Sequence, residues 1–190
     1  MADVMNILLV GVGGQGTILA SKILSTGLIT AGYDVKMSEI HGMSQRGGSV
    51  STQVRFGQKV YSPIIGKGEA DVLVAFEEME ALRYLENLKP DGKIVVNDYR
   101  QPSAPILMGK CDYPAGVLEE IKSKADTTVI KAAEIATSLG NPKCMNVVLF
   151  GALVKAMGLK NIDWEAAIRE TVKPKTIDVN IAAYKAGYAI

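Results

Sequence analysis

The chain has 190 residues, 48% of them hydrophobic, and its 21 basic and 20 acidic residues leave a formal net charge of +1. This length can bury about two-thirds of the unfolded surface in one core and is too short for two full domains. The basic residues are scattered rather than gathered into a stripe, which argues against nucleic acid as a partner.

The two cysteines and the first apolar run exclude further classes of protein. Cys111 and Cys144 are far apart and outside any C-x-x-C pair, so this chain alone cannot hold an iron–sulfur cluster, which needs about four thiolates. The apolar run at residues 7–10 is far shorter than a membrane span and is followed by glycines. We therefore expect a soluble, cytoplasmic protein without a metal site or membrane contact.

Strand and helix patterns alternate over the first part of the chain. A continuous apolar run at residues 5–10 predicts a strand buried on both faces, and apolar residues at helical spacing predict a helix over 17–31. Residues 34–40 follow as a second strand, so the opening segment is a βαβ unit. Residues 49–56 alternate like a strand, and the short connection before them predicts that this strand runs antiparallel to its neighbour.

Similar patterns continue to the end of the chain. Residues 57–58 predict a hairpin turn into a strand at 59–62, and three prolines interrupt the segment 101–116, where a short edge strand is expected at 107–108. The other predicted elements are strand 70–76, helix 77–88, a turn at 89–92, strand 93–97, helix 117–124, strand 127–131 and helices 132–139, 144–157, 164–172 and 177–188. Together they predict a single three-layer α/β/α Rossmann-like domain with a mixed, mostly parallel sheet.

A glycine turn separates the first predicted strand from the first helix. Gly11, Gly13 and Gly16 keep the G-x-G-x-x-G spacing, with Gly14 and Gln15 at the variable positions. Such a turn lets backbone N–H groups approach an anion at the positive end of a helix. Three interpretations stay open: a phosphate-like group bound within a complex, an NAD(P) site, or glycines that serve only the turn and helix packing.

Glu39 stands where a dinucleotide site would hold the ribose hydroxyls, about twenty positions after the glycine turn. This placement favours a stand-alone NAD(P)-binding protein, which a titration with NAD(H) and NADP(H) would test. The chain offers little chemistry to match, because none of its tyrosines is followed four residues later by lysine and no second domain could hold a substrate.

The loop that follows the second strand carries more side chains that could bind a ligand than the glycine turn does. It carries the only histidine together with two hydrogen-bonding side chains, an arginine and a glycine pair: His41, Ser44, Gln45, Arg46, Gly47 and Gly48. The loop lies at the carboxyl edge of the sheet, where open α/β sheets bind ligands, so it should converge with the glycine turn. Arg46 could bond both oxygens of a carboxylate or phosphate, while a salt bridge for Arg46 and a loop-ordering hydrogen bond for His41 stay open.

These two loops supply the candidate site residues. The catalytic candidates are His41 and Arg46. The cofactor-binding candidates are Gly11, Gly13, Gly14, Gln15, Gly16, Ser44, Gln45, Arg46, Gly47 and Gly48. Glu77 and Glu78 follow a strand on the same side, but acidic residues at a helix start commonly complement the helix dipole, so they are not expected to be catalysts. Asn146 is interpreted as a satisfied buried amide, and two alternatives stay open, a side chain that points toward the cleft or a cap for a neighbouring loop.

The motifs at 11–16 (GVGGQG) and 41–50 (HGMSQRGGSV), with the segments 146–151 and 173–180, resemble the gamma-type domain of the 2-oxoacid:ferredoxin oxidoreductases. The resemblance covers nearly the whole chain, so residues 1–190 are predicted to be one such domain. The form EIHGMSQRGG is most similar to the indolepyruvate oxidoreductase beta subunit. The pyruvate and 2-oxoglutarate types share the glycine turn and an Arg-Gly-Gly element, and they remain alternatives.

The resemblance implies a heteromeric enzyme that oxidatively decarboxylates a 2-oxoacid, forms an acyl-CoA and passes electrons to ferredoxin. No cofactor is expected on this chain alone. The complex is expected to use thiamine diphosphate, Mg, iron–sulfur clusters and coenzyme A, with a large thiamine- and cluster-binding subunit as partner; homodimer contacts stay open. The sequence agrees, because its only Asp-Gly pair, Asp91-Gly92, follows proline instead of opening a Gly-Asp-Gly diphosphate motif.

Overall fold

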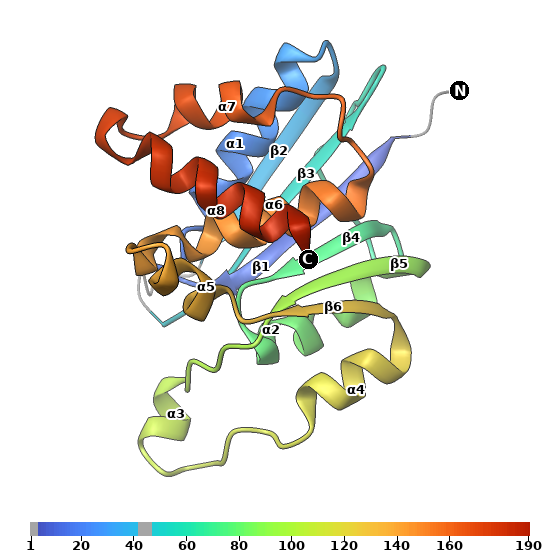
Figure 1. The fold of residues 1–190 in the computed structure, drawn as a ribbon. Helices are drawn as coiled ribbons and strands as arrows, with labels where there is room; N and C mark the ends of the chain where they lie inside the picture. The colour runs from blue at the N-terminus through green and yellow to red at the C-terminus, as the bar shows by residue number, and fades with distance from the viewer. Residues whose placement is uncertain (1–3, 42–46) are drawn as a thin grey trace.

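The computed structural model describes residues 4–41 and 47–190, and within them one six-stranded sheet carries helices on both faces (Figure 1). The strands are β1 (Met5–Val12), β2 (Asp34–His41), β3 (Ser49–Gly57), β4 (Ala70–Ala75), β5 (Leu88–Asn97) and β6 (Asp126–Ile130). The helices are α1 (Thr17–Thr30), α2 (Glu78–Arg83), α3 (Ala104–Leu107), α4 (Val117–Lys124), α5 (Ala132–Ser138), α6 (Met145–Met157), α7 (Trp164–Thr171) and α8 (Ile177–Ala189). Short 3-10 turns occupy η1 (Leu85–Asn87), η2 (Pro142–Cys144) and η3 (Pro174–Thr176).

The sheet is mixed, as predicted, with the strand order β2-β3-β1-β4-β5-β6. The pairs β1–β4, β4–β5 and β5–β6 are parallel, whereas β3 is antiparallel to both of its neighbours, β1 and β2. The short connection from β2 forces this direction, because a parallel neighbour would need a long crossover. As a result β3 lies between the two strands of the opening βαβ unit, and β2 becomes the edge strand.

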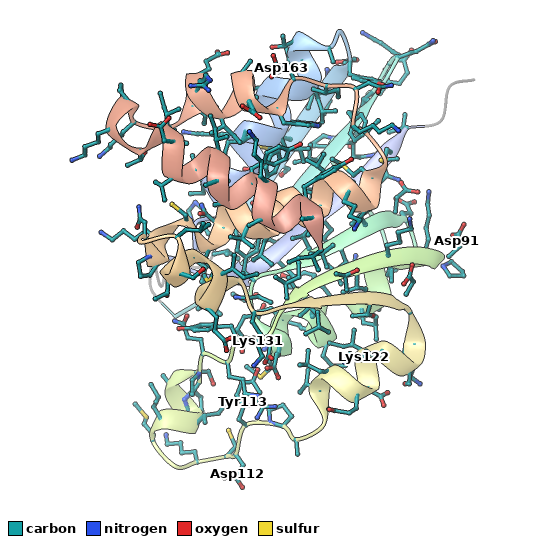
Figure 2. All side chains as sticks on the ribbon, viewed as in Figure 1. Asp91, Asp112, Tyr113, Lys122, Lys131 and Asp163 are labelled. Atoms are coloured by element: carbon teal, nitrogen blue, oxygen red, sulfur yellow. The ribbon has the colours of Figure 1, made fainter. Side chains whose placement is uncertain are left out.

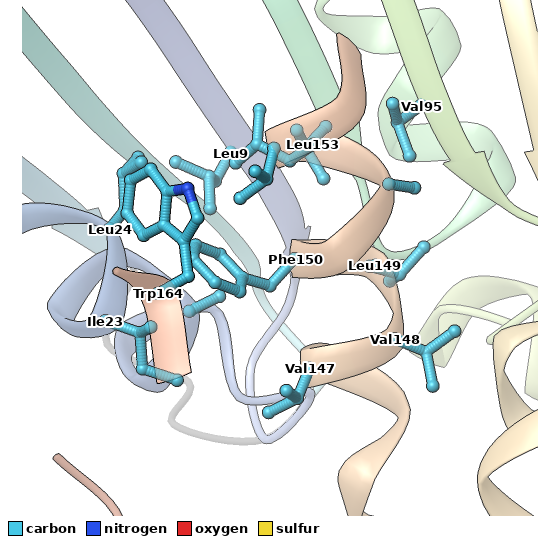
Figure 3. Packing of buried hydrophobic residues seen from close by; sticks show 14 of the residues in the cluster. Leu9, Ile23, Leu24, Val95, Val147, Val148, Leu149, Phe150, Leu153 and Trp164 are labelled. Carbon is cyan, nitrogen blue, oxygen red and sulfur yellow. The ribbon is translucent and has the colours of Figure 1, made fainter. Parts of the chain in front are cut away.

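The core has two parts, one on each face of the sheet. Helices α1 and α6 cover one face, with α7 and α8 packed over them, and α2 and α4 cover the other. On the first face the Trp164 ring meets Phe150 edge to face with 5.4 Å between centroids (Figure 3). The same ring lies over Gly27 of α1, where a Cβ atom would be 2.4 Å from a ring carbon. The absence of a side chain at Gly27 therefore lets α7 approach α1.

The predicted hairpin strand at residues 59–62 is wrong. This stretch is an irregular loop, and side chains from the sheet satisfy its backbone. The Val60 amide donates to the Asp34 carboxylate at 2.9 Å, and Arg55 donates to the Ser62 carbonyl at 3.1 Å. Because these groups already have partners, the segment needs no strand pairing to bury its polar backbone.

Three other predicted elements differ from the structure. The helix expected over 77–88 ends at Arg83, and Leu88 instead begins β5 by pairing with Ala70. The turn expected at 89–92 is therefore part of β5, where the register shift between Ala70 and Val72 accommodates Pro90. The edge strand expected at 107–108 is also wrong, since residues 104–107 form α3 with proline at its start, a position that suits proline.

All strands except β3 end at one edge of the sheet. The glycine turn follows β1, the His41–Gly48 loop follows β2, α2 follows β4, and a long excursion follows β5. In the described part of the chain no helix is long and apolar enough to cross a membrane. The carboxyl edge of the sheet therefore gathers the loops that carry the candidate residues.

Candidate functional site

A cleft of about 410 Å³ lies beside the glycine turn, where β2 ends and β3 begins. Its walls come from the turn, the start of α1 and the ends of β2 and β3: Gly13, Gly14, Gly16, Thr17, Ile18, Glu39, His41 and Val50. The Gly13 amide donates to the Gly48 carbonyl at 2.9 Å, which joins the two loops directly. The Gly48 end of the second loop therefore lies beside the glycine turn.

The glycines of the turn are needed for different structural reasons. A Cβ atom at Gly11 would lie 2.7 Å from the Gln15 side chain and 2.9 Å from Phe76, and one at Gly16 would lie 2.6 Å from Asn146. These two glycines allow close packing inside the chain. Gly14 has a φ of 101° and no neighbouring heavy atom within 4 Å of the position of a Cβ, so it is the glycine that leaves room beside the turn.

The side chain of Gln15 folds back onto its own turn. Its Oε1 accepts a hydrogen bond from the Val12 amide at 2.8 Å, and its Nε2 donates to the Gln101 side chain at 3.4 Å. Gln15 therefore stabilises the turn and links it to the excursion after β5. The Gly13 amide, already bonded to Gly48, likewise serves the loop itself.

Glu39 and His41 both line the cleft, and both side chains are exposed. The dinucleotide interpretation needs β2 directly beside β1, but Glu39 pairs with Thr52 of the intervening β3. The carboxylate is thus one strand further from the glycine turn than in a βαβ dinucleotide site. The other loop candidates, Ser44, Gln45 and Arg46, lie outside the described residues.

Asn146, at the start of α6, forms a hydrogen bond to the glycine turn. Its Nδ2 donates to the Gly16 carbonyl at 3.1 Å, so the residue caps the turn, which is one of the predicted alternatives. The side chain is 4% exposed, and its Oδ1 has no partner within the described residues. Asn146 therefore connects α6 to the start of α1 and retains a buried acceptor.

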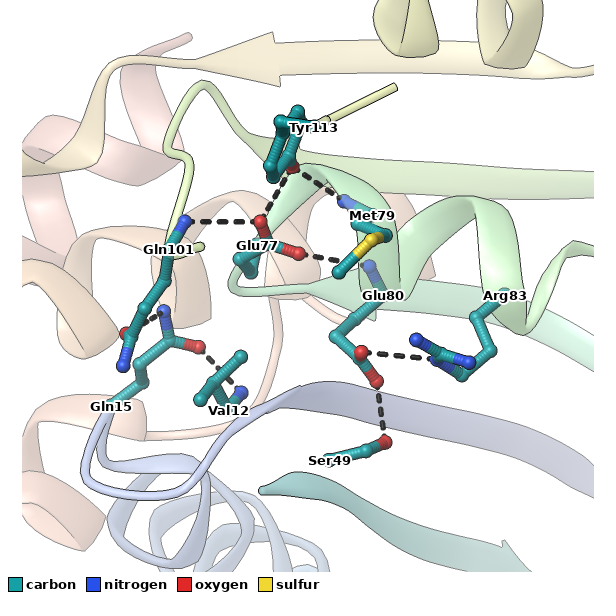
Figure 4. Close-up of polar contacts among 9 residues, drawn as sticks. All are labelled: Val12, Gln15, Ser49, Glu77, Met79, Glu80, Arg83, Gln101 and Tyr113. Atoms are coloured by element: carbon teal, nitrogen blue, oxygen red, sulfur yellow. Dashed lines mark hydrogen bonds and ion pairs between the residues drawn. The ribbon is translucent and has the colours of Figure 1, made fainter. Parts of the chain in front are cut away.

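A buried carboxylate, Glu77, organises the other side of the edge (Figure 4). Glu77 is fully buried and caps α2 by accepting the Glu80 amide at 3.0 Å. Its second oxygen accepts from the Tyr113 hydroxyl at 2.6 Å and from the Gln101 amide at 3.1 Å. The Tyr113 oxygen in turn accepts the Met79 amide at 3.1 Å. Burial and the adjacent carboxylate raise the pKa of Tyr113 far above its ordinary value, so its proton stays in this bond.

A second buried carboxylate, Glu80, extends the network to the His41–Gly48 side. It accepts hydrogen bonds from the Ser49 hydroxyl and, at 3.1 Å, from Arg83. Sequence reasoning assigned no role to Tyr113, Gln101 or Ser49. The one available signal was the pair Glu77-Glu78 directly after a buried strand. In the structure this pair connects α2 to residues 100–113 through hydrogen bonds with Arg100, Gln101 and Tyr113.

Glu78 pairs with Arg100 at 2.9 Å, although Glu78 is 1% exposed and the arginine side chain is 55% exposed. Burial raises the pKa of Glu78 above its usual 4.5, and the bond to Arg100 offsets this only in part. The same contact raises the pKa of Arg100, which remains protonated throughout the accessible range. Glu78 is therefore the member of the pair that titrates.

The Glu78 shift predicts a pH dependence of stability. A carboxyl whose pKa is raised by folding binds its proton more tightly in the folded chain, so its contribution to the free energy of unfolding falls as the pH rises past about 4.5. We expect the advantage of wild type over Glu78→Gln, which cannot titrate, to shrink between pH 4 and pH 7 in urea denaturation. An advantage that grows with pH would show that the Arg100 bond outweighs burial.

The described lining of the cleft offers one feature that favours a negative group, the start of α1, and one that opposes it, the carboxylate of Glu39. The fourteen-residue α1 points its N-terminus at the cleft beside the open space at Gly14, and helix N-termini favour negative charge. Within residues 4–41 and 47–190, no group of three His, Cys, Asp or Glu side chains lies close enough together to hold a metal ion. A negatively charged group at this edge would thus gain from the start of α1 and lose from the Glu39 carboxylate.

Fold and site together define the class of protein: an α/β domain with a small cleft at the carboxyl edge of its sheet, beside the glycine turn. A family model described as pyruvate ferredoxin/flavodoxin oxidoreductase matches residues 6–190. The chain belongs to this family and is a subunit of a 2-oxoacid:ferredoxin oxidoreductase.

Similar proteins span nearly the whole chain. The indolepyruvate oxidoreductase subunit IorB of Thermococcus kodakarensis is 41% identical over 190 residues, covering 96% of this chain and 93% of that one. The pyruvate oxidoreductase subunit PORC of Thermotoga maritima has a TM-score of 0.73 at 24% identity and covers 98% and 96% of the two chains. The 2-oxoglutarate:ferredoxin oxidoreductase of Magnetococcus marinus matches with a TM-score of 0.72 at 21% identity, over 98% of this chain and 30% of that chain. These two structures share the fold.

Proposed function

We propose that this chain is the small subunit of an indolepyruvate-type 2-oxoacid:ferredoxin oxidoreductase and that residues 1–190 act as one gamma-type domain. The observation that carries the proposal is the 41% identity to an IorB subunit over almost the full length of both chains. With a large subunit that binds thiamine diphosphate, Mg and iron–sulfur clusters, the complex would decarboxylate an aryl-pyruvate in a coenzyme A-dependent oxidation and reduce ferredoxin. The unpaired cysteines, Cys111 and Cys144, accord with a reducing cytoplasm.

Within the complex, we assign the cleft to an anionic group of a cofactor. The thiamine and iron–sulfur groups of the partner supply the decarboxylation and electron-transfer chemistry. This chain contributes the positive end of α1 and the open side of Gly14, which favour a negative group. Arg46 would supply a bidentate contact to the same group. His41, whose side chain lines the cleft, would orient that group. Gly11, Gly16 and Gln15 would keep the turn in shape.

Substrate choice is tested with the assembled enzyme. The chain is co-expressed with its large subunit under anoxic conditions, and viologen reduction is measured with indolepyruvate, pyruvate and 2-oxoglutarate, each with and without coenzyme A. We expect the highest kcat/KM for indolepyruvate and little turnover without coenzyme A. A preference for pyruvate or 2-oxoglutarate would assign the chain to another subtype of the family.

The proposed role of the His41–Gly48 loop predicts a loss of activity in Arg46→Ala. Removing one charge-assisted contact to a cofactor should lower kcat/KM by about tenfold to a hundredfold, since such hydrogen bonds contribute roughly 1.5–3 kcal/mol. The matched control is Arg169→Ala on α7, whose side chain is 55% exposed and lies 3.9 Å from Glu165. If Arg46→Ala keeps both assembly and turnover at the level of the control, Arg46 has no role in the site.

A further inference from the structure

Two separate routes of hydrogen bonds connect the glycine turn to the first turn of α2 (Figure 4). The first route starts at Glu77, whose carboxylate accepts the Gln101 amide at 3.1 Å. Gln101 belongs to the excursion between β5 and α4, here called the arm (residues 99–116), and its side chain accepts the Nε2 of Gln15 at 3.4 Å. The Oε1 of Gln15 accepts the Val12 amide at 2.8 Å, so this route ends where β1 enters the turn.

The arm is fixed at the point that carries Gln101. Near its other end, the Tyr113 hydroxyl donates to the same oxygen of Glu77 at 2.6 Å, and Arg100 stacks over the Tyr113 ring at 5.3 Å. Figure 2 shows Tyr113 on the side of the arm that faces the body and Asp112 on the outer side. Because both ends of the arm are held at Glu77, Gln101 meets the glycine turn from a fixed position.

The second route starts at Glu80, one turn further along α2. Its carboxylate accepts a hydrogen bond from the Ser49 hydroxyl, at the start of β3. Ser49 is paired with Val12 across the β1–β3 ladder, and the carbonyl of the preceding residue, Gly48, accepts the Gly13 amide at 2.9 Å. Both routes therefore meet at Val12 and Gly13, the two residues that lead from β1 into the turn.

The common anchor of the two routes is rigid and shielded from water. Glu77 is fully buried and Glu80 is 3% exposed, and the Glu80 amide donates to the Glu77 carboxylate at 3.0 Å. α2 follows β4, the neighbour of β1 in the sheet, and its Ala81 is part of the core. Hydrogen bonds to a carboxylate are stronger than those between neutral groups, and burial reduces competition from water. The first turn of α2 therefore fixes where β1 hands over to the glycine turn.

The glycine turn needs such support because of its own composition. Four of its six residues, at positions 11, 13, 14 and 16, are glycines, which permit the turn but restrict its backbone less than any other residue would. Three of these glycines line the cleft. Burying two carboxylates costs free energy that apolar residues in their place would not. Their hydrogen bonds offset this cost and select one conformation of a segment that glycine leaves free.

We propose that Ser49, Glu80 and Gln101 are positioning residues for the cleft, which hold the glycine turn in the conformation that binds the negatively charged group of a cofactor, an inference that rests on the proposed function. None of the three is among the described residues that line the cleft, so they act on a ligand only through the turn. Without these bonds the turn would populate further conformations, and the apparent affinity would fall with the fraction that is competent to bind.

The test measures cofactor binding by the chain co-expressed with its large subunit. Ser49→Ala removes the donor to Glu80, whereas Ser49→Thr keeps a hydroxyl at the same position. Coenzyme A and thiamine diphosphate, which both carry a diphosphate, are titrated separately into the purified complex after bound cofactor has been removed. We expect Ser49→Ala to raise the Kd of one of them by about threefold to tenfold and Ser49→Thr to stay near wild type.

A second variant tests the other route. Gln101→Met, of similar size, removes the link to the glycine turn and keeps the main-chain bond to α2. Its effect should be smaller than that of Ser49→Ala, because a contact of 3.4 Å between neutral amides is weaker than a bond to a carboxylate. The matched control, Ser123→Ala on α4, removes another exposed hydroxyl near the opposite edge of the sheet, where it donates to the Glu120 carbonyl at 2.7 Å. This control should bind both cofactors like wild type.

Hydrogen exchange gives a readout that does not depend on a ligand. In Ser49→Ala the amides of residues 12–18 should exchange faster than in wild type, while those of α6 keep their protection. Unchanged Kd values for both cofactors, or unchanged exchange of the turn, would overturn the inference even if the Tm falls, and would leave the proposed function standing. A wild-type complex without coenzyme A-dependent oxidation of a 2-oxoacid would overturn both.

Discussion

Replacing Gly187 by alanine is expected to destabilise the chain by about 2 kcal/mol or more, although alanine favours a helix by about 1 kcal/mol over glycine. A Cβ atom at Gly187 of α8 would lie 1.8 Å from the Val148 carbonyl oxygen of α6. From the other side, a Cβ at Gly151 of α6 would lie 2.2 Å from the Tyr184 carbonyl oxygen. The clash involves main chain on both sides and cannot be relieved by a rotamer change, so the two helices would have to separate.

The matched control is Gly140→Ala, which follows α5 at a φ of 84° and has no atom within 4 Å of the new Cβ. It carries only the backbone cost of a left-handed residue, about 1 kcal/mol. Urea denaturation of the purified chain should rank Gly187→Ala as clearly less stable than Gly140→Ala. Equal stability of the two variants would mean that α6 and α8 are packed less closely than the structure has them.

Replacing Glu77 by alanine is expected to cost about 3 kcal/mol or more, because three donors lose a buried acceptor and each unsatisfied group costs about 1–3 kcal/mol. These donors are the Glu80 amide, the Gln101 amide and the Tyr113 hydroxyl. Glu77→Gln should recover only part of the loss, since its amide NH₂ would face one of the donors. Tyr113→Phe removes one contact to the carboxylate and the acceptor of the Met79 amide, and it should cost less than Glu77→Ala, which leaves three donors without their acceptor.

Thermal and urea denaturation measure the loss of stability, and hydrogen exchange shows which part of the chain loses protection. In Glu77→Ala, amides at the two ends of the arm should exchange faster than in wild type, while those of α6 keep their order of protection. The control, Glu134→Ala, removes a carboxylate that is 72% exposed and should change stability by less than about 0.5 kcal/mol. If Glu77→Ala unfolds at the same urea concentration as this control, the network does not stabilise the edge.

The elements predicted correctly are those whose pattern reflects burial along their whole length. β1 is buried at all positions but its first, and such a strand needs a continuous apolar run. The end of α1 also follows from its sequence, because Gly32 adopts a φ of 88° and ends the helix there. The Tyr33 amide donates to the Leu28 carbonyl at 3.1 Å and so satisfies the last turn. In these cases local chemistry and tertiary packing agree.

The failed predictions are segments whose partners lie far away in the chain. Residues 59–62 have a strand-like local pattern, but the carboxylate of Asp34 and the guanidinium of Arg55 take up their backbone groups. Leu88 continues the helical spacing of α2, yet pairing with Ala70 draws it into the sheet. Local spacing cannot report such contacts, because their energy depends on where the rest of the chain has folded.

For the candidate site, the order of strands and loops along the chain already predicts that the glycine turn and the His41–Gly48 loop share an edge, since loops after strands of like direction meet there. The sequence also carries the motifs by which the family is known. The use of each group depends on contacts that form only in the folded chain: Gly16 makes room for Asn146, Gln15 stabilises its own turn, and Gly14 faces open space. The Glu77 network joins residues 24 and 36 positions apart, and no local pattern encodes contacts that form only when separate strands bring their ends together.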